Sequence, residues 1–182
     1  MAKVYVFLAE GFEEVEALTP VDLLRRAQVE VCTVSVSGKR EVTGARKIPV
    51  TADILFEDND FSDADITVLP GGMPGTLNLA AHQGLEKLLA ERNEKGQRIA
   101  AICAAPTIFG DRGYLNGKSA VCYPGMEERL TGAEIPEASV VTDGHITTSR
   151  GVGTAIDFAL ELITLLCGKE KAEEIARSVV YR

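Results

Sequence analysis

Four short and nearly continuous apolar runs most limit the folds open to this chain. They span residues 4–9, 29–36, 65–69 and 98–102, and turn residues bound each of them. Uninterrupted apolar runs of this length are typical of strands that are buried on both faces of a parallel sheet. A fifth strand is expected at 146–149. The pattern therefore predicts an α/β protein with a mostly parallel sheet.

Helical patterns alternate with these strands. Pro20 is expected to kink or break the first helix. Segments 37–60 and 119–149 contain short extended pieces separated by glycines, which suggests hairpin-like additions at the sheet edges. We therefore predict one domain, 1–182, with an open, doubly wound sheet and helices on both faces. The expected helices cover residues 14–27, 83–94, 104–111, 154–167 and 170–178.

Composition and charge narrow the class of partner. The 182 residues bear a formal net charge of −8 and their Lys and Arg form no stripe, so no nucleic-acid partner is expected. The first apolar run is too short to cross a membrane or to form the core of a secretory signal. The four cysteines have neither CxxC nor zinc-ligand spacing. We therefore expect a cytoplasmic protein with free thiols, no metal and no membrane contact.

The ends of the predicted strands bring four different turns to one edge of the sheet. Residues 10–16 are acidic, residues 71–75 are rich in glycine, Cys103 follows the fourth strand and Arg150 follows the fifth. Ligand sites in open α/β sheets form beyond the carboxyl ends of the strands. This convergence predicts a functional site centred on Cys103.

Cys103 lies between a predicted strand and a predicted helix, with small residues on both sides. This context favours the sharp turn of a nucleophile elbow. A helix N-terminus and unpaired backbone N–H groups would lower the pKa of the thiol below its usual value of roughly 8.5. The alternative is a small buried apolar residue at a strand end. The neighbouring motifs favour the reactive interpretation.

Glu16 is the candidate proton carrier. It lies one helical turn beyond Glu13, and a carboxyl group beside a thiolate would have to retain a proton, which it could donate and take back. Glu13 and Glu14 are expected to be solvated first-turn acids that complement the helix dipole. The glycine pair Gly71–Gly72 is either a plain tight turn or a way to bring a backbone N–H close to a substrate.

Other polar residues give weaker signals. Arg150 is expected to pair with an acid or to cap a terminus rather than to bind substrate. His82 and His145 are expected to be solvated, with His82 at the start of a helix. Cys32 and Cys167 are expected in the core, and the environment of Cys122 is left open.

Four motifs together resemble the ThiJ/PfpI superfamily. They are AEGFEEVE, VLPGG, AAICAAP and TSRGVGT, and they occur in order from about residue 3 to the C-terminus. Within the superfamily the chain is similar to the branch of the Parkinsonism protein DJ-1, including its bacterial YajL-type members. The resemblance implies a flavodoxin-like fold, related to class I glutamine amidotransferases, and a homodimer.

The resemblance also implies roles for individual residues. Cys103 matches the oxidation-prone nucleophile, Glu16 its protonated partner, and Gly72 and Ala104 the amides of an oxyanion hole. Gly71, Tyr123 and Arg150 are expected at the pocket edge. Arg46 matches an arginine that approaches the pocket across a dimer interface, and Arg26 another basic residue of the pocket edge.

Two departures from the wider superfamily bear on the chemistry. Protease-like members have a His directly after the nucleophile, whereas this chain has Ala104, which disfavours a Cys–His protease. Some members have a His where this chain has Tyr123, so the proton transfer falls to Glu16.

The activity that these residues and the resemblance suggest needs no cofactor. Cys103 would add to a small 2-oxoaldehyde, and methylglyoxal would become lactate without glutathione; the related removal of early glyoxal adducts (deglycase activity) is also ascribed to this branch. The alternative is a redox-sensing or chaperone-like stress protein that uses the same oxidisable cysteine with negligible turnover.

Overall fold

The computed structural model describes residues 2–181 of the chain. One seven-stranded sheet runs through it in the order β5-β2-β1-β6-β7-β9-β8, and β3 and β4 form a separate two-stranded sheet. The strands are β1 (Lys3–Leu8), β2 (Glu30–Ser35), β3 (Glu41–Thr43), β4 (Pro49–Thr51), β5 (Ile54–Leu55), β6 (Ile66–Leu69), β7 (Arg98–Ile102), β8 (Val140–Asp143) and β9 (Ile146–Ser149). The α-helices are α1 (Glu14–Arg26), α2 (Gly75–Ala81), α3 (Gln83–Glu94), α4 (Pro106–Asp111), α5 (Ala155–Cys167) and α6 (Lys169–Ser178).

The large sheet is parallel except for β8, which pairs antiparallel with β9. The chain winds from β1 to β2 on one side and then crosses to β6, β7 and β9 on the other. The five main parallel strands thus follow the 2-1-3-4-5 order of flavodoxin-like folds, with the topological switch point between β1 and β6. The predicted α/β fold class is confirmed, and the fold places the expected site at this switch point.

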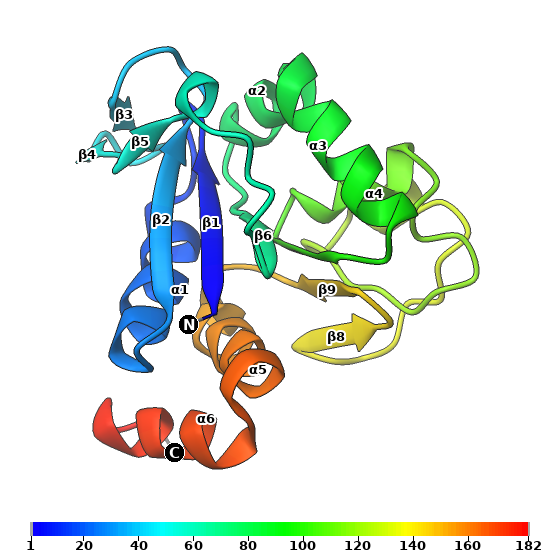
Figure 1. Ribbon diagram of the computed structural model, residues 1–182. Helices are drawn as coiled ribbons and strands as arrows, with labels where there is room; N and C mark the ends of the chain where they lie inside the picture. The colour runs from blue at the N-terminus through cyan, green and yellow to red at the C-terminus, as the bar shows by residue number, and fades with distance from the viewer. Residues whose placement is uncertain (1, 182) are drawn as a thin grey trace.

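Helices cover both faces of the sheet, as Figure 1 shows. On one face, α1, α5 and α6 pack on side chains such as Val6 and Val68. On the other face, α2, α3 and α4 pack on side chains such as Phe7 and Leu69. Successive residues of β1 and of β6 thus enter opposite cores, which is why both strands are mostly apolar.

The main differences from the sequence prediction lie in the helices. Pro20 does not break α1, which is continuous across it. Helix α2 was not predicted, because its glycine-rich start resembles the end of a turn. Helix α4 begins at Pro106 rather than at Ala104, which leaves Ala104 in the turn after β7.

The two segments with glycine-separated extended pieces behave differently. In the second, β8 and β9 form the expected hairpin at the sheet edge. In the first, β5 joins the edge, but β3 and β4 pair only with each other. No helix within residues 2–181 has both the length and the apolar character needed to cross a bilayer.

Candidate active site

Cys103 lies in the turn between β7 and α4 with a φ of 66°, a conformation that residues other than glycine seldom adopt. Its N–H donates to Ser149 O at 3.0 Å, and its C=O accepts from Tyr123 N at 2.8 Å. Two neighbouring segments therefore hold the turn in a strained conformation, a situation frequent at functional sites. The strand-turn-helix context predicted for a nucleophile elbow is present.

The Cys103 sulfur lies among three hydrogen-bonding groups. The backbone N–H groups of Gly72 and Ala104 act on the pKa of the thiol from one side, and the Glu16 carboxyl group acts on it from another. The Gly72 N–H comes from the β6–α2 turn, where Gly72 adopts a φ of 92°. The structure thus brings together four residues that the sequence placed on three separate turns.

Glu16 projects from the first turn of α1 and is only 1% exposed. Its Oε2 accepts from Gly71 N at 3.0 Å. Among residues 2–181 the other oxygen, Oε1, has no hydrogen-bond partner. Glu16 lines the cavity described below. One carboxylate oxygen is therefore anchored and the other is available to the sulfur or to a substrate.

Gly71 is required by the close approach of Glu16 and Cys103. A Cβ atom at position 71 would lie 2.5 Å from Glu16 Oε2 and 2.6 Å from Cys103 Cβ. Both distances are far below van der Waals contact. Any side chain at position 71 would therefore separate the carboxyl group from the thiol.

The protonation of this pair differs from the sequence prediction. Burial and the Glu16 carboxylate raise the pKa of Cys103 to about 12, although the N–H groups of Ala104 and Gly72 act in the opposite direction. The predicted lowering of the thiol pKa is thus wrong, because the N–H groups do not outweigh burial and a neighbouring acid. Burial likewise raises the pKa of Glu16 to about 7, and the charge of Glu13 adds to this.

Such a pair titrates as a unit. Its first proton leaves near neutral pH and its second only in strong base, so the pair holds one proton over most of the physiological range. The N–H groups of Gly72 and Ala104 favour the form with the charge on sulfur. The N–H of Gly71 favours the form with the charge on the carboxylate.

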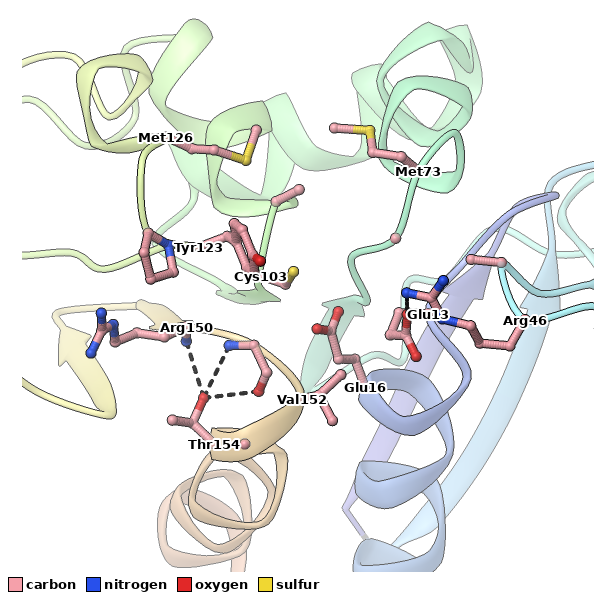
Figure 2. A pocket seen from close by; sticks show the side chains of 16 residues that line it. Glu13, Glu16, Arg46, Met73, Cys103, Tyr123, Met126, Arg150, Val152 and Thr154 are labelled. Carbon is pink, nitrogen blue, oxygen red and sulfur yellow. Dashed lines mark hydrogen bonds and ion pairs between the residues drawn. The ribbon is translucent and has the colours of Figure 1, made fainter.

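A cavity of about 820 Å³ opens above this pair, and Figure 2 shows the side chains that line it. Tyr123, Arg46 and Arg150 line it together with Cys103 and Glu16, whereas Gly71, which was also expected at the pocket edge, does not. Arg46 contributes to the cavity of its own chain and forms an ion pair with Glu13, with Nη2 and Oε2 3.5 Å apart. No group of three or more His, Cys, Asp or Glu side chains within residues 2–181 is arranged to hold a metal ion.

Glu13 and Glu14 are buried rather than solvated as predicted, at 7% and 4% exposure. Glu14 Oε1 accepts from Arg46 N at 2.8 Å and so fixes the turn that presents Arg46. A Cβ at position 44 would lie 2.2 Å from the same oxygen, so only glycine fits there. These acids organise the cavity wall instead of facing water.

The sequence was compared with known protein families, and one family matches most of it. The model of the DJ-1/PfpI family matches residues 2–165. The chain belongs to the DJ-1/PfpI family. The ThiJ/PfpI resemblance in the four sequence motifs is thereby confirmed.

Several DJ-1/PfpI relatives resemble most of this chain. DJ-1 homolog B of Arabidopsis thaliana is 41% identical over 99% of the chain, which spans only 42% of that relative's length. A Caenorhabditis elegans protein named glutathione-independent glyoxalase DJR-1.2 is 31% identical over 92% of the chain and 90% of its own length. The solved structure of oxidized DJ-1 from Toxoplasma gondii has a TM-score of 0.95 and 37% identity, covering 100% of this chain and 99% of that one.

Some predicted residues of this DJ-1/PfpI chain lie elsewhere. Arg26 lies at the C-terminal end of α1, does not line the cavity of its own chain, and forms an ion pair with Asp22. Cys167 is exposed rather than in the core, and Cys32 is only half-buried.

The two histidines are less solvated than expected. The His82 side chain is only 20% exposed, and its Nδ1 accepts from Leu85 N as the cap of α3. His145 is half-buried and hydrogen-bonded to Asn93. Neither histidine lines the cavity.

Three apolar residues of the cavity were missed by sequence reasoning. Met73, Met126 and Val152 line it. Met73 follows the Gly71–Gly72 turn after β6, and Val152 follows Arg150 after β9. The rule that sites form beyond strand ends could therefore have indicated both residues. Met126 lies in an irregular segment between α4 and β8, where no local pattern indicates a site.

Proposed function

We propose that this chain is a cysteine-dependent enzyme that converts small 2-oxoaldehydes to 2-hydroxy acids without a cofactor, with methylglyoxal and lactate as the simplest case. The observation that supports this most is the buried Glu16 carboxyl group, which lies next to the Cys103 thiol in the wall of an open cavity. A nucleophile next to its own proton acceptor is the arrangement that covalent catalysis requires.

The first step is addition of the Cys103 sulfur to the aldehyde carbon. Glu16 takes the thiol proton, a carbon–sulfur bond forms, and the aldehyde oxygen becomes an oxyanion. The N–H groups of Gly72 and Ala104 already point at the sulfur, and the oxyanion forms only two bonds away from it. These N–H groups are the proposed oxyanion hole.

The second step is an internal proton transfer. Glu16 first gives the thiol proton to the oxyanion, which forms the hydroxyl group of a hemithioacetal and leaves Glu16 as a carboxylate. Glu16 then removes the proton from the former aldehyde carbon and returns it to the neighbouring carbonyl carbon, while the hydroxyl proton passes to the former ketone oxygen, which converts the hemithioacetal into a thioester. Water then hydrolyses the thioester to the 2-hydroxy acid and frees the thiol. The balance is one oxoaldehyde plus one water giving one hydroxy acid, so no oxidant or reductant is needed.

The pKa of Glu16 suits this role. A general base is most effective when its pKa lies near the working pH, and burial raises that of Glu16 to about 7. The C. elegans relative named as a glutathione-independent glyoxalase supports the same reaction class. Deglycase activity would use the same addition step on adducts of these aldehydes.

The alternative function is a redox-sensing or chaperone-like stress protein. The N–H groups at the sulfur would also stabilise a sulfinate on Cys103, and the solved T. gondii relative is described as oxidized. Both functions need the same cysteine. Turnover distinguishes them.

A homodimer and a cytoplasmic location are part of the same proposal. Val15 and Leu18 expose apolar side chains on α1, and Ile48 does so beside Arg46. In such a dimer Arg46 or Arg26 would lie close to the partner's cavity. Four free cysteines are consistent with a reducing compartment.

The test is lactate formation from methylglyoxal by the purified full chain in glutathione-free buffer containing a metal chelator. We expect steady formation of lactate by the wild type and none above background by Cys103→Ser. Cys167→Ser is the matched control, because Cys167 is an exposed thiol outside the cavity. Lactate formation by Cys103→Ser at the wild-type rate would exclude the mechanism, and absence of turnover in the wild type would favour the stress-sensor function.

A further inference from the structure

The cavity is much larger than the simplest substrate. Its volume of about 820 Å³ lies in the range of roughly 300–1,000 Å³ that accommodates drug-sized ligands. Methylglyoxal has five non-hydrogen atoms and would occupy a small part of it. The remaining space is part of the same cavity as Cys103 and therefore lies within reach of a substituent on a bound aldehyde.

Several apolar side chains are exposed at the mouth of the cavity, which the exposed Arg46 and Arg150 also line. Met73, Tyr123 and Val152 line it while remaining 46%, 52% and 49% exposed. Met126 and Pro124 complete this part of the wall. Exposed apolar side chains that gather at one place usually mark a contact surface rather than ordinary protein exterior.

The two methionines of the cavity lie apart from its acidic groups. In Figure 2, Met73 and Met126 lie on the side of Cys103 opposite to Glu16. The Glu13–Arg46 ion pair lies on the Glu16 side, on and near α1. An aldehyde attached to Cys103 would thus have its reacting carbons next to Glu16 and its substituent next to the two thioethers.

From this geometry we propose that the substrates for which the site is built are 2-oxoaldehydes with an apolar substituent of several carbons, and that Met73 and Met126 contact that substituent. The inference rests on the proposed function and specifies its substrate class. Methionine side chains are flexible and polarisable, so a pair of them accommodates branched or flat groups of different shape. The substituent takes no part in the reaction, in which one oxoaldehyde and one water still give one 2-hydroxy acid.

The test compares methylglyoxal with 4-methyl-2-oxopentanal, which has an isobutyl group in place of the methyl group. Both are alkyl-substituted, so their aldehydes have similar intrinsic reactivity toward a thiol. Initial rates of 2-hydroxy acid formation give kcat/KM for each. We expect the wild type to prefer the isobutyl compound by about tenfold, as partial burial of three additional carbon groups implies.

Variants identify the contact. The preference is expected to fall toward unity in Met73→Ala combined with Met126→Ala, and part of the way in each single variant. Leu77→Ala is the matched control, since Leu77 is an exposed apolar residue of α2 that does not line the cavity, and it should keep the full preference.

The outcomes separate the two proposals. Turnover of methylglyoxal with equal or lower kcat/KM for the isobutyl compound would overturn this inference and leave the proposed function standing. A wild-type preference that the double methionine variant retains would also overturn it. No turnover of either aldehyde would remove the proposed function and this inference with it.

Discussion

Cys103 and Cys122 lie in neighbouring parts of the molecule but in different surroundings. Burial is the largest cause that raises the pKa of each thiol, to about 12 for Cys103 and about 11 for Cys122. The Cys103 thiol, however, also interacts with the Glu16 carboxyl group and with the backbone N–H groups of Gly72 and Ala104. The Cys122 thiol donates only weakly to Tyr123 O, 3.5 Å away, and lines a smaller cavity of about 250 Å³.

The difference between the two cysteines lies in their partners and not in their burial. Burial opposes the thiolate at both positions. Only at Cys103 is there a nearby acceptor for the proton and a set of donors for the resulting charge. In the function that we propose, the reactivity of Cys103 would therefore come from the groups around its sulfur, above all from Glu16.

The largest expected effect on turnover comes from replacing the carboxylate near Cys103. The comparison replaces the carboxylate near Cys122 in the same way. Glu16→Gln keeps the size of the side chain but cannot take the thiol proton, so kcat/KM for methylglyoxal should fall by about 10²–10⁴. The matched variant is Glu127→Gln, because the Glu127 charge contributes to the raised pKa of Cys122. It should change the rate less than twofold, and equal losses in both variants would break the comparison.

A second effect concerns stability. The pKa of Glu16 is raised from 4.5 to about 7 in the folded chain, so the folded state binds the proton more tightly than the unfolded state. The contribution of Glu16 to stability is therefore greatest below pH 4.5 and is lost as the pH rises toward 7. The cost at pH 8 is about 3 kcal/mol. Urea unfolding should show that Glu16→Gln gains about 2–3 kcal/mol relative to wild type between pH 5 and pH 8, because part of the cost is already present at pH 5.

The same unfolding experiment could also contradict the raised pKa of Glu16. If wild type and Glu16→Gln change in stability by the same amount between the two pH values, Glu16 is not held with a raised pKa. The Glu127→Gln variant again serves as the control, and its pH dependence should follow that of the wild type.

The smallest expected effect is at Cys122 itself. Cys122→Ser replaces a buried thiol outside the main cavity, so methylglyoxal turnover should stay within about twofold of wild type. Steady-state rates at saturating and at low aldehyde concentration check this. A loss comparable to that of Cys103→Ser would mean that the smaller cavity belongs to the reaction.

Much of this arrangement could be predicted from the sequence, because it depends on local patterns. The buried strands are recognisable as nearly continuous apolar runs. The rule that sites form at the carboxyl ends of such strands predicts that Cys103, Glu16 and Gly72 lie close together. The need for glycine at position 71 follows only from the distance between Glu16 and Cys103, which no local pattern encodes.

What could not be predicted depends on long-range contacts. Glu13 and Glu14 have the sequence context of solvated first-turn acids, but the turn that includes Arg46 covers them. The direction of the Cys103 pKa shift likewise depends on the sum of burial, two N–H groups and one acid, which come from three separate segments. A sequence shows which groups meet, but not which of their opposing effects is larger.

The most direct test of the shared proton is the pH dependence of alkylation at Cys103. Iodoacetamide labelling followed by peptide mass spectrometry measures Cys103 separately from the other three cysteines. In the wild type the labelling rate should rise with an inflection near pH 7, where the pair loses its first proton, and Glu16→Gln should lack that inflection. The same rate profile in both proteins would contradict the central claim that Glu16 controls the ionisation of Cys103.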